Sequence, residues 1–171
     1  MSKVSHFCKD LMDYLTAGVT PFHVVSETAR RLDAAGFRAL DEAEPWRLEP
    51  GGRYRVQRND SSLIAFVVGR AAPEATGLRL VGAHTDSPCL RIKPEPVLAG
   101  SGCARLGVEV YGGVLLNPWF DRALSVAGRV HTIDAAGTIR GRLLDVGRAV
   151  ATVPSLAIHL DREANEKRSV N

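Results

Sequence analysis

Apolar residues recur at helical spacing over the first part of the chain. Within residues 4–15 they return every three or four positions, which predicts an amphipathic helix that stops before Gly18. A second helix is predicted to begin at Pro21, because Thr20 is a good N-cap and proline fits the first turn. This helix is expected to end at Gly36, since a left-handed glycine closes many helices.

Further along the chain the pattern changes to a period of two. Residues 53–57 alternate apolar and polar side chains, and the Asn-Asp pair at residues 59–60 predicts a turn before residues 62–69. This stretch is therefore predicted to form a β-hairpin. Residues 78–83 are mostly apolar and lead directly into His84, which is typical of a strand buried on both faces.

The second half of the chain has the pattern of a β-rich region. Residues 94–102 contain two prolines and two glycines, which fit neither a helix interior nor a central strand, so we place a domain junction near there. Beyond it, residues 106–116, 124–133 and 138–146 are strand-like and are separated by turn residues. Residues 154–160 start with a proline and are predicted to open a short helix.

The composition is that of a globular protein and excludes several classes. Of the 171 residues, 45% are hydrophobic and 24% charged, which excludes a disordered tail or a fibre. The 22 basic residues exceed the 19 acidic ones by only three and form no run, so no nucleic-acid partner is expected. Apolar runs such as residues 63–68 fall far short of the ~20 residues that cross a bilayer, and the N-terminus lacks the apolar centre of a secretory signal. We expect a cytoplasmic protein that does not bind membranes.

The cysteines do not suggest a disulfide framework. Cys8, Cys89 and Cys103 are odd in number and form no CxxC pair, so we expect reduced thiols and no zinc site built from cysteine. The nucleotide-binding glycine patterns, the G-x-S-x-G elbow and the H-E-x-x-H helix are also absent from the sequence.

The strongest candidate for chemistry is the His-x-Asp pair at the end of the predicted buried strand. Open α/β sheets place ligands at the carboxyl ends of strands. A metal-binding imidazole needs an acceptor on its second ring nitrogen, which Asp86 can provide to His84. Alternatively, Asp86 accepts backbone N–H groups at the turn before Pro88. The pair taken alone favours this second interpretation.

The other candidate residues have simpler interpretations. His159 is a single histidine in an apolar stretch, which is usually a core or interface residue whose ring nitrogens are satisfied by hydrogen bonds. Asp121 is expected either to pair with a local cation or to orient a turn. Three further histidines lack ligand-type neighbours and are expected at the surface; they are His6, His23 and His131.

Longer strings carry more information than these pairs. They are residues 82–94 (GAHTDSPCLRIKP), 107–113 (GVEVYGG), 117–122 (NPWFDR) and 154–162 (PSLAIHLDR). Together they closely resemble the M18 (aspartyl aminopeptidase-like) family of zinc aminopeptidases, from the N-terminal helices to about Glu166.

This resemblance implies an α/β zinc-exopeptidase catalytic domain with two Zn²⁺ ions per active site, followed by a β-rich dimerisation domain. Residues 1–95 would then form the N-terminal part of the catalytic domain, and residues 96–171 an incomplete dimerisation domain. The family acts on the N-terminal residues of peptides, with a preference for acidic residues in its eukaryotic members. It assembles into large homo-oligomers, commonly dodecamers.

The resemblance also implies roles for three residues. His84 matches a zinc ligand, and Asp86 matches the neighbouring catalytic acid that supports the metal site. His159 matches a histidine of the dimerisation domain that contacts metal or substrate in an active site. No substrate-binding residue is assigned.

The sequence departs from the family in length and at two places. Ala123 stands where the family usually has an acidic residue, and residues 167–171 have no resemblance to it. Family members are more than twice as long, and their bridging Asp, Glu-Glu pair, further Asp and final His have no counterpart in this sequence. We therefore expect a truncated chain that is inactive alone. The alternative is a non-catalytic interaction or assembly module of the same family.

Overall fold

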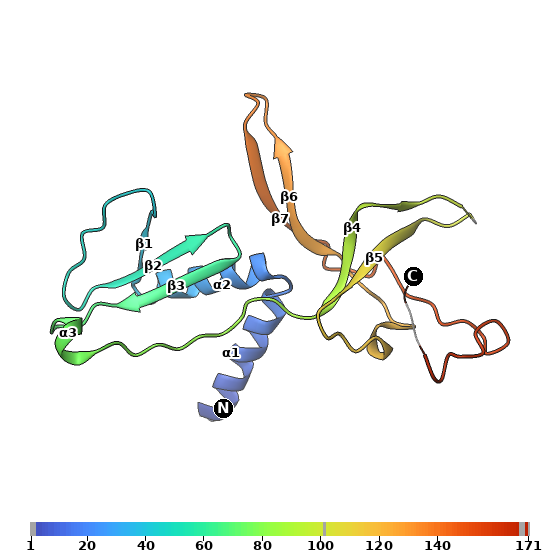
Figure 1. Cartoon of the computed structure of the whole chain (residues 1–171), viewed down its shortest axis with the longest axis horizontal. Coiled ribbons are helices and arrows are strands. Elements are labelled where there is room, and N and C mark those ends of the chain that lie inside the picture. The colour runs from blue at the N-terminus through green and yellow to red at the C-terminus, as the bar shows by residue number, and fades with distance from the viewer. Residues whose placement is uncertain (1–2, 101, 168–169, 171) are drawn as a thin grey trace. The chain divides into compact units, whose positions relative to one another are not determined.

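The computed structural model describes residues 3–100, 102–167 and 170, and it is a mixed α/β structure, as predicted (Figure 1). Contacts within the chain group the residues into two compact units. The first consists of Met1–Asp86 and Ala127–Asp145, and the second of Ser87–Val126 and Val146–Asn171. In the part of the chain described, no helix combines the length and the apolar character needed to span a bilayer.

The first unit begins with the two predicted helices, α1 (Lys3–Ala17) and α2 (Pro21–Ala34). Thr20 caps α2, because its hydroxyl accepts a hydrogen bond from the backbone N–H of His23. The same hydroxyl lies 2.7 Å from Nδ1 of His23, so this half-buried histidine takes part in the cap, whereas a surface position was expected. Gly36 follows α2 with φ of +83°, as its sequence position predicted.

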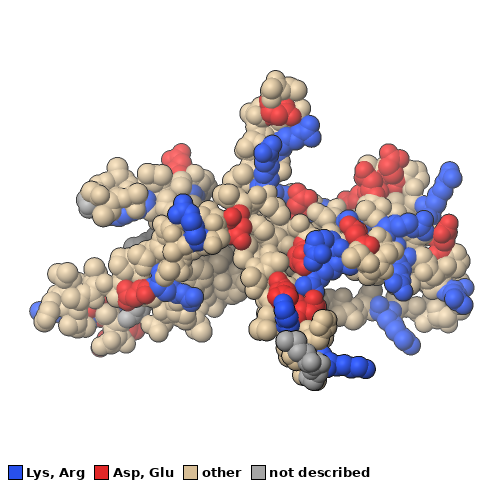
Figure 2. All heavy atoms as spheres, turned by 180° about the vertical axis from the view of Figure 1, so that it is seen from behind, with Lys and Arg blue, Asp and Glu red and all other residues tan. Residues whose placement is uncertain are grey.

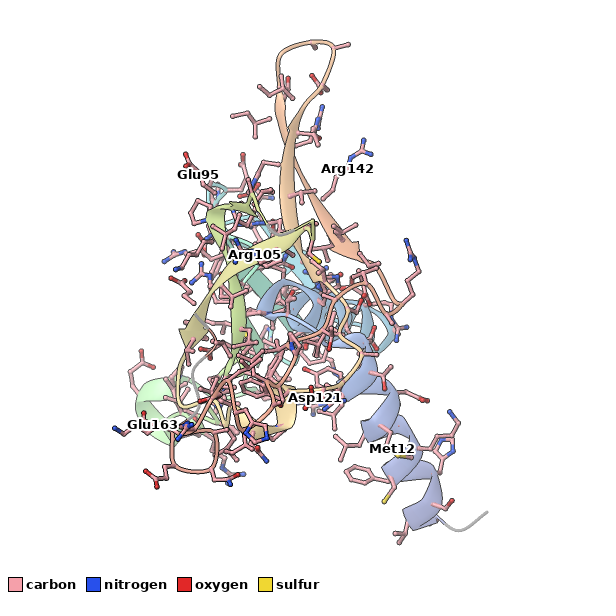
Figure 3. All side chains as sticks on the ribbon, turned by 90° about the vertical axis from the view of Figure 1, so that its right-hand side faces the viewer. Met12, Glu95, Arg105, Asp121, Arg142 and Glu163 are labelled. Carbon is pink, nitrogen blue, oxygen red and sulfur yellow. The ribbon has the colours of Figure 1, made fainter. Side chains whose placement is uncertain are left out.

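Polar contacts join the two helices. Arg31 of α2 donates two hydrogen bonds of 2.8 Å to the carboxylate of Asp10 of α1. The hydroxyl groups of Tyr14 and Thr28 lie 2.8 Å apart. The outer face of α1 remains exposed along its whole length, as the side chain of Met12 illustrates (Figure 3).

The three-stranded sheet of the first unit contains the predicted hairpin. Strands β2 (Arg53–Arg58) and β3 (Ser62–Val67) pair antiparallel, and the connecting Asn59 and Asp60 have φ of 49° and 54°. Two positive φ values are the signature of the tight turn that suits the twist of a hairpin. A short strand that the sequence did not predict, β1 (Arg38–Leu40), pairs parallel with β2.

Helix α2 packs on this sheet and forms a small core with it (Figure 1). The buried apolar residues of the described chain are Val25, Ala29, Tyr54 and Val56. They come from the inner faces of α2 and β2, which are the faces predicted by the helical and the alternating patterns.

Residues 78–83 do not form the predicted buried strand. They follow a short helix, α3 (Pro73–Thr76), and run without regular structure, with Leu80 87% and Val81 fully exposed. A buried strand needs neighbours on both edges and both faces, and the described residues place no strand beside this segment. The prediction of a buried strand is therefore wrong for this chain.

The second unit contains strands β4 (Cys89–Leu98) and β5 (Arg105–Tyr111), which pair antiparallel. Pro94 and Pro96 lie inside β4, where we expected an interruption of regular structure. A strand with one neighbour tolerates proline because its outer N–H groups bond to no partner strand. Both prolines also lie where the β4–β5 register shifts, between Ile92 and Val97.

Three further elements of secondary structure follow in the second half of the chain. They are a 3-10 helix, η1 (Asn117–Trp119), and the antiparallel pair β6 (Ala127–Ile133) and β7 (Ile139–Asp145). The β6–β7 pair follows the prediction and belongs to the first unit. The predicted helix at residues 154–160 is wrong, because residues 154–157 have no regular structure and residues 158–160 form a turn.

Glu27 on α2 makes the free energy of unfolding pH-dependent in the acid range. Hydrogen bonds from Arg30 and then Arg31 lower its pKa from 4.5 to about 2, and its side chain is 13% exposed. The stabilisation of the folded state by the ionised Glu27 carboxylate is complete above the unfolded-state pKa near 4.5, and it is lost as the pH falls toward 2. Since Arg30 is largely exposed, we expect Glu27→Gln to cost about 1–2 kcal/mol at pH 7 and almost nothing at pH 2. Urea unfolding of both proteins at the two pH values measures this, and parallel pH profiles would contradict it.

Candidate functional site

The His84–Asp86 pair adopts a compact local geometry at the end of the exposed apolar segment. Nδ1 of His84 lies 2.7 Å from the backbone oxygen of Asp86 and 3.2 Å from its carboxylate Oδ1. Both neighbouring atoms are acceptors, so the proton of the neutral ring belongs on Nδ1 and the lone pair on Nε2. This arrangement prepares Nε2 to bind a metal ion, and the backbone oxygen makes the shorter of the two contacts.

The pair is accessible to solvent but anchored on one side. The side chains of His84 and Asp86 are 79% and 42% exposed. Between them, Thr85 donates a hydrogen bond of 2.9 Å to the backbone oxygen of Ser61, which ties the segment to the β2–β3 hairpin. The sequence indicated the pair but not this anchor, because Ser61 and Thr85 are far apart in the chain.

The described residues do not complete a metal centre. Within residues 3–100, 102–167 and 170, no three His, Cys, Asp or Glu side chains are close enough together to hold an ion. Zinc takes about four ligands, of which catalytic sites supply three from the protein. His84 with Asp86 provides one oriented ligand, so the described residues do not by themselves complete a catalytic zinc site.

His159 lies in the second unit, in the turn that follows residues 154–157. Its side chain is exposed, and the turn is closed by a 2.8 Å hydrogen bond from the backbone N–H of Leu160 to the oxygen of Ala157. Of the two positions that its apolar neighbours suggested, a place in the core is wrong for the described chain, and a place in an interface stays a prediction. His84 belongs to the first unit and His159 to the second.

Asp121 has a role that the sequence left open. Its carboxylate accepts the backbone N–H of Ser155 at 2.8 Å, and its φ is +54°. Of the two alternatives from the sequence, orientation of a turn matches this contact. The usable signal was the residue type, because aspartate tolerates the left-handed region better than most residues.

A pocket of about 350 Å³ lies within the first unit and is formed by α2, the β2–β3 hairpin and the β6–β7 pair. Charged side chains around it already have partners. Arg30 bonds Glu27, Asp33 bonds Arg55, and Arg129 bonds Asp60. The pKa of Asp33 is lowered, chiefly by its hydrogen bond from Arg55. The pocket thus lies where these elements pack together, and its lining contains no residue of the segment that carries His84.

Basic and acidic side chains are interspersed on the face shown in Figure 2, without a surface of a single sign. The structure joins no two of the three cysteines in a disulfide, and their reduced state stays a prediction. The absence of a nucleic-acid partner stays a prediction.

Comparison with known proteins identifies close relatives over nearly the whole chain. The sequence model of the family described as Aminopeptidase I zinc metalloprotease (M18) matches residues 14–171. A probable M18 family aminopeptidase 2 from Pseudomonas paraeruginosa is 59% identical over 161 residues, which are 94% of this chain and 37% of that protein. The protein of the same name from Azotobacter vinelandii is 58% identical over the same shares. The chain thus spans little more than a third of the length of these relatives.

Solved structures are similar to this chain over nearly the same residues. A chain of the Ape4 and Nbr1 complex, solved by cryo-EM, is similar with a TM-score of 0.87 and 40% identity, over 95% of this chain and 31% of that one. The S. cerevisiae mApe1 dodecamer is similar with a TM-score of 0.83 and 29% identity, over 92% of this chain and 37% of that one.

Proposed function

This chain belongs to the Aminopeptidase I zinc metalloprotease (M18) family, and we propose that it supplies part of the active site of a zinc-dependent aminopeptidase that removes N-terminal residues from peptides. The observation that carries the proposal is the geometry of His84, whose Nδ1 is held by Asp86 while Nε2 is left to bind a metal. Acidic N-terminal residues are the substrates we would test first.

In that proposal, this chain supplies only some of the groups of the active site. His84 supplies one zinc ligand, Asp86 orients its ring, and His159 contacts metal or substrate. A hydrolytic site with two Zn²⁺ ions also needs further carboxylate ligands and a general base. Among the described residues, no three His, Cys, Asp or Glu side chains lie close enough together to hold a metal ion. We propose that these groups come from polypeptide outside this sequence.

The proposal extends to assembly. The similar S. cerevisiae mApe1 structure is a dodecamer, and we propose that this chain also takes part in a homo-oligomer. We propose that residues 1–95 belong to the catalytic domain and residues 96–171 to a dimerisation domain. A cytoplasmic location stays a prediction, which cell fractionation tests.

Zinc binding and peptidase activity test the role of His84 directly. We expect the purified chain to bind Zn²⁺ weakly, to lose this binding in His84→Ala and to keep it in His131→Ala, an exposed histidine on β6 that serves as control. The same samples should not hydrolyse Asp- or Glu-anilides. Zinc-dependent turnover by the pure chain would show that it needs no further polypeptide.

A chimera tests the activity itself. We would join this chain to the C-terminal remainder of the 59% identical Pseudomonas paraeruginosa protein. The chimera should hydrolyse N-terminal residues, and His84→Ala should lower kcat/KM by about 1,000-fold or more, the scale of losing a group that acts on the reacting atoms. Equal activity of the chimera and its His84→Ala variant would refute the assigned role.

The exposed segment at residues 78–83 favours a second candidate function, an assembly module without catalysis. Leu78, Leu80 and Val81 are each more than 70% exposed, and such apolar surface promotes association. We expect Leu80→Lys to reduce self-association of the purified chain severalfold by light scattering, whereas Leu15→Lys on α1 controls for a general loss of apolar surface. No difference between the two variants would contradict a specific contribution of this segment.

A further inference from the structure

Two segments of the second unit lie side by side where Asp121 is located. Leu124 pairs with Ala151, with a hydrogen bond of 2.9 Å from the N–H of Leu124 to the oxygen of Ala151. On the other side of Asp121, Phe120 forms a bridge with Val153. Backbone pairing thus brings residues 151–155 alongside residues 120–124.

Asp121 contacts this second segment at two points. Its backbone N–H donates a hydrogen bond of 2.9 Å to the oxygen of Val153, and its carboxylate Oδ1 accepts the N–H of Ser155 at 2.8 Å. The left-handed backbone of Asp121, with φ of +54°, allows both contacts. Aspartate, asparagine and glycine are the residues that adopt this conformation at least cost.

The segment held by Asp121 leads directly to His159. Beyond Ser155 the chain enters the turn closed by hydrogen bonds from Leu160 and Asp161 to the oxygen of Ala157. Leu156 and Ile158 are 56% and 47% exposed, so apolar burial contributes little to the path of this stretch. Its direction therefore depends strongly on the polar contacts at its start.

We propose that Asp121 is a positioning residue, which fixes residues 153–155 and thereby the place of the turn that carries His159. The proposal rests on the proposed function only for the role of His159. The hydrogen bond from Ser155 to Asp121 is a property of this chain and can be measured without an activity assay.

Three substitutions separate the two properties of Asp121. Asp121→Asn keeps an oxygen acceptor and tolerates a positive φ. Asp121→Gly keeps the backbone conformation but removes the acceptor, and Asp121→Ala loses both. Amide hydrogen exchange of Ser155 should be about tenfold faster in Asp121→Gly, which corresponds to one lost hydrogen bond, and should return toward the wild-type rate in Asp121→Asn.

The second measurement is the backbone mobility of residues 157–161, from NMR relaxation of their amides. These amides should become more mobile in Asp121→Gly, while the amides of β2 and β3 in the first unit keep their wild-type exchange rates. Unchanged exchange at Ser155 in Asp121→Gly, or faster exchange throughout the chain, would overturn the proposal.

A double-mutant cycle in the chimera distinguishes positioning from general stability. If Asp121 acts through His159, Asp121→Gly lowers kcat/KM in the parent but has little further effect in a His159→Ala background. Additive losses would show that Asp121 does not act through His159. An inactive parent chimera would count against the proposed function, and the exchange experiment would still decide whether Asp121 holds Ser155.

Discussion

Tyr54→Ala is expected to lower the free energy of unfolding by about 3–5 kcal/mol, the range for removing a large buried aromatic side chain. Tyr54 is 1% exposed, and its ring centroid lies 5.6 Å from that of Phe66. Its hydroxyl accepts hydrogen bonds from the Glu49 N–H at 2.9 Å and from Arg38 Nη2 at 2.8 Å. The core of the described residues has only three other buried apolar side chains, so we expect the space that the ring leaves to remain largely unfilled.

Tyr54→Phe separates packing from hydrogen bonding. It retains the ring but leaves the N–H of Glu49 without its acceptor, so we expect a smaller loss of about 1–2 kcal/mol. Gly52→Ala should also destabilise, because an added Cβ would lie 2.5 Å from the hydroxyl oxygen of Tyr54. Urea unfolding followed by circular dichroism measures all three, and a loss below about 1 kcal/mol for Tyr54→Ala would contradict this account of the core.

Arg129→Met is expected to detach the β6–β7 pair from α2 and the β2–β3 turn, at a cost of about 2–3 kcal/mol. Arg129 is 14% exposed and lies over the ring of Phe22 at 4.2 Å. It donates hydrogen bonds to the backbone oxygen of Asn59 at 2.8 Å and to the carboxylate of Asp60 at 3.2 Å. Methionine keeps much of the apolar stem, so the change removes mainly the guanidinium contacts.

Arg140→Met provides the matched control on the same strand pair. Arg140 pairs with Asp134 at 3.1 Å but is 63% exposed, and such surface ion pairs contribute about 0–1 kcal/mol. Urea unfolding and amide exchange of β6 should therefore distinguish the two variants. Equal stability losses, or unchanged exchange of β6 in Arg129→Met, would show that Arg129 does not hold the pair in place.

The sequence alone determined the elements that depend on neighbouring residues. Thr20 and Gly36 predicted both ends of α2, and the Asn-Asp pair at residues 59–60 predicted the hairpin turn. Caps and tight turns are satisfied by groups a few residues apart, so their chemistry is visible in the order of residues. The His84–Asp86 contact belongs to the same class, because its two residues are separated by one position.

Tertiary structure decided the features whose partners are distant in the chain. The apolar composition of residues 78–83 predicted burial, but burial requires neighbouring strands, which the described residues do not place there. Arg129 meets Asn59 across 70 positions, and Asp121 meets Ser155 across 34. Such pairs are selected by how the folded elements approach one another, and a single sequence records the residue types but not that approach.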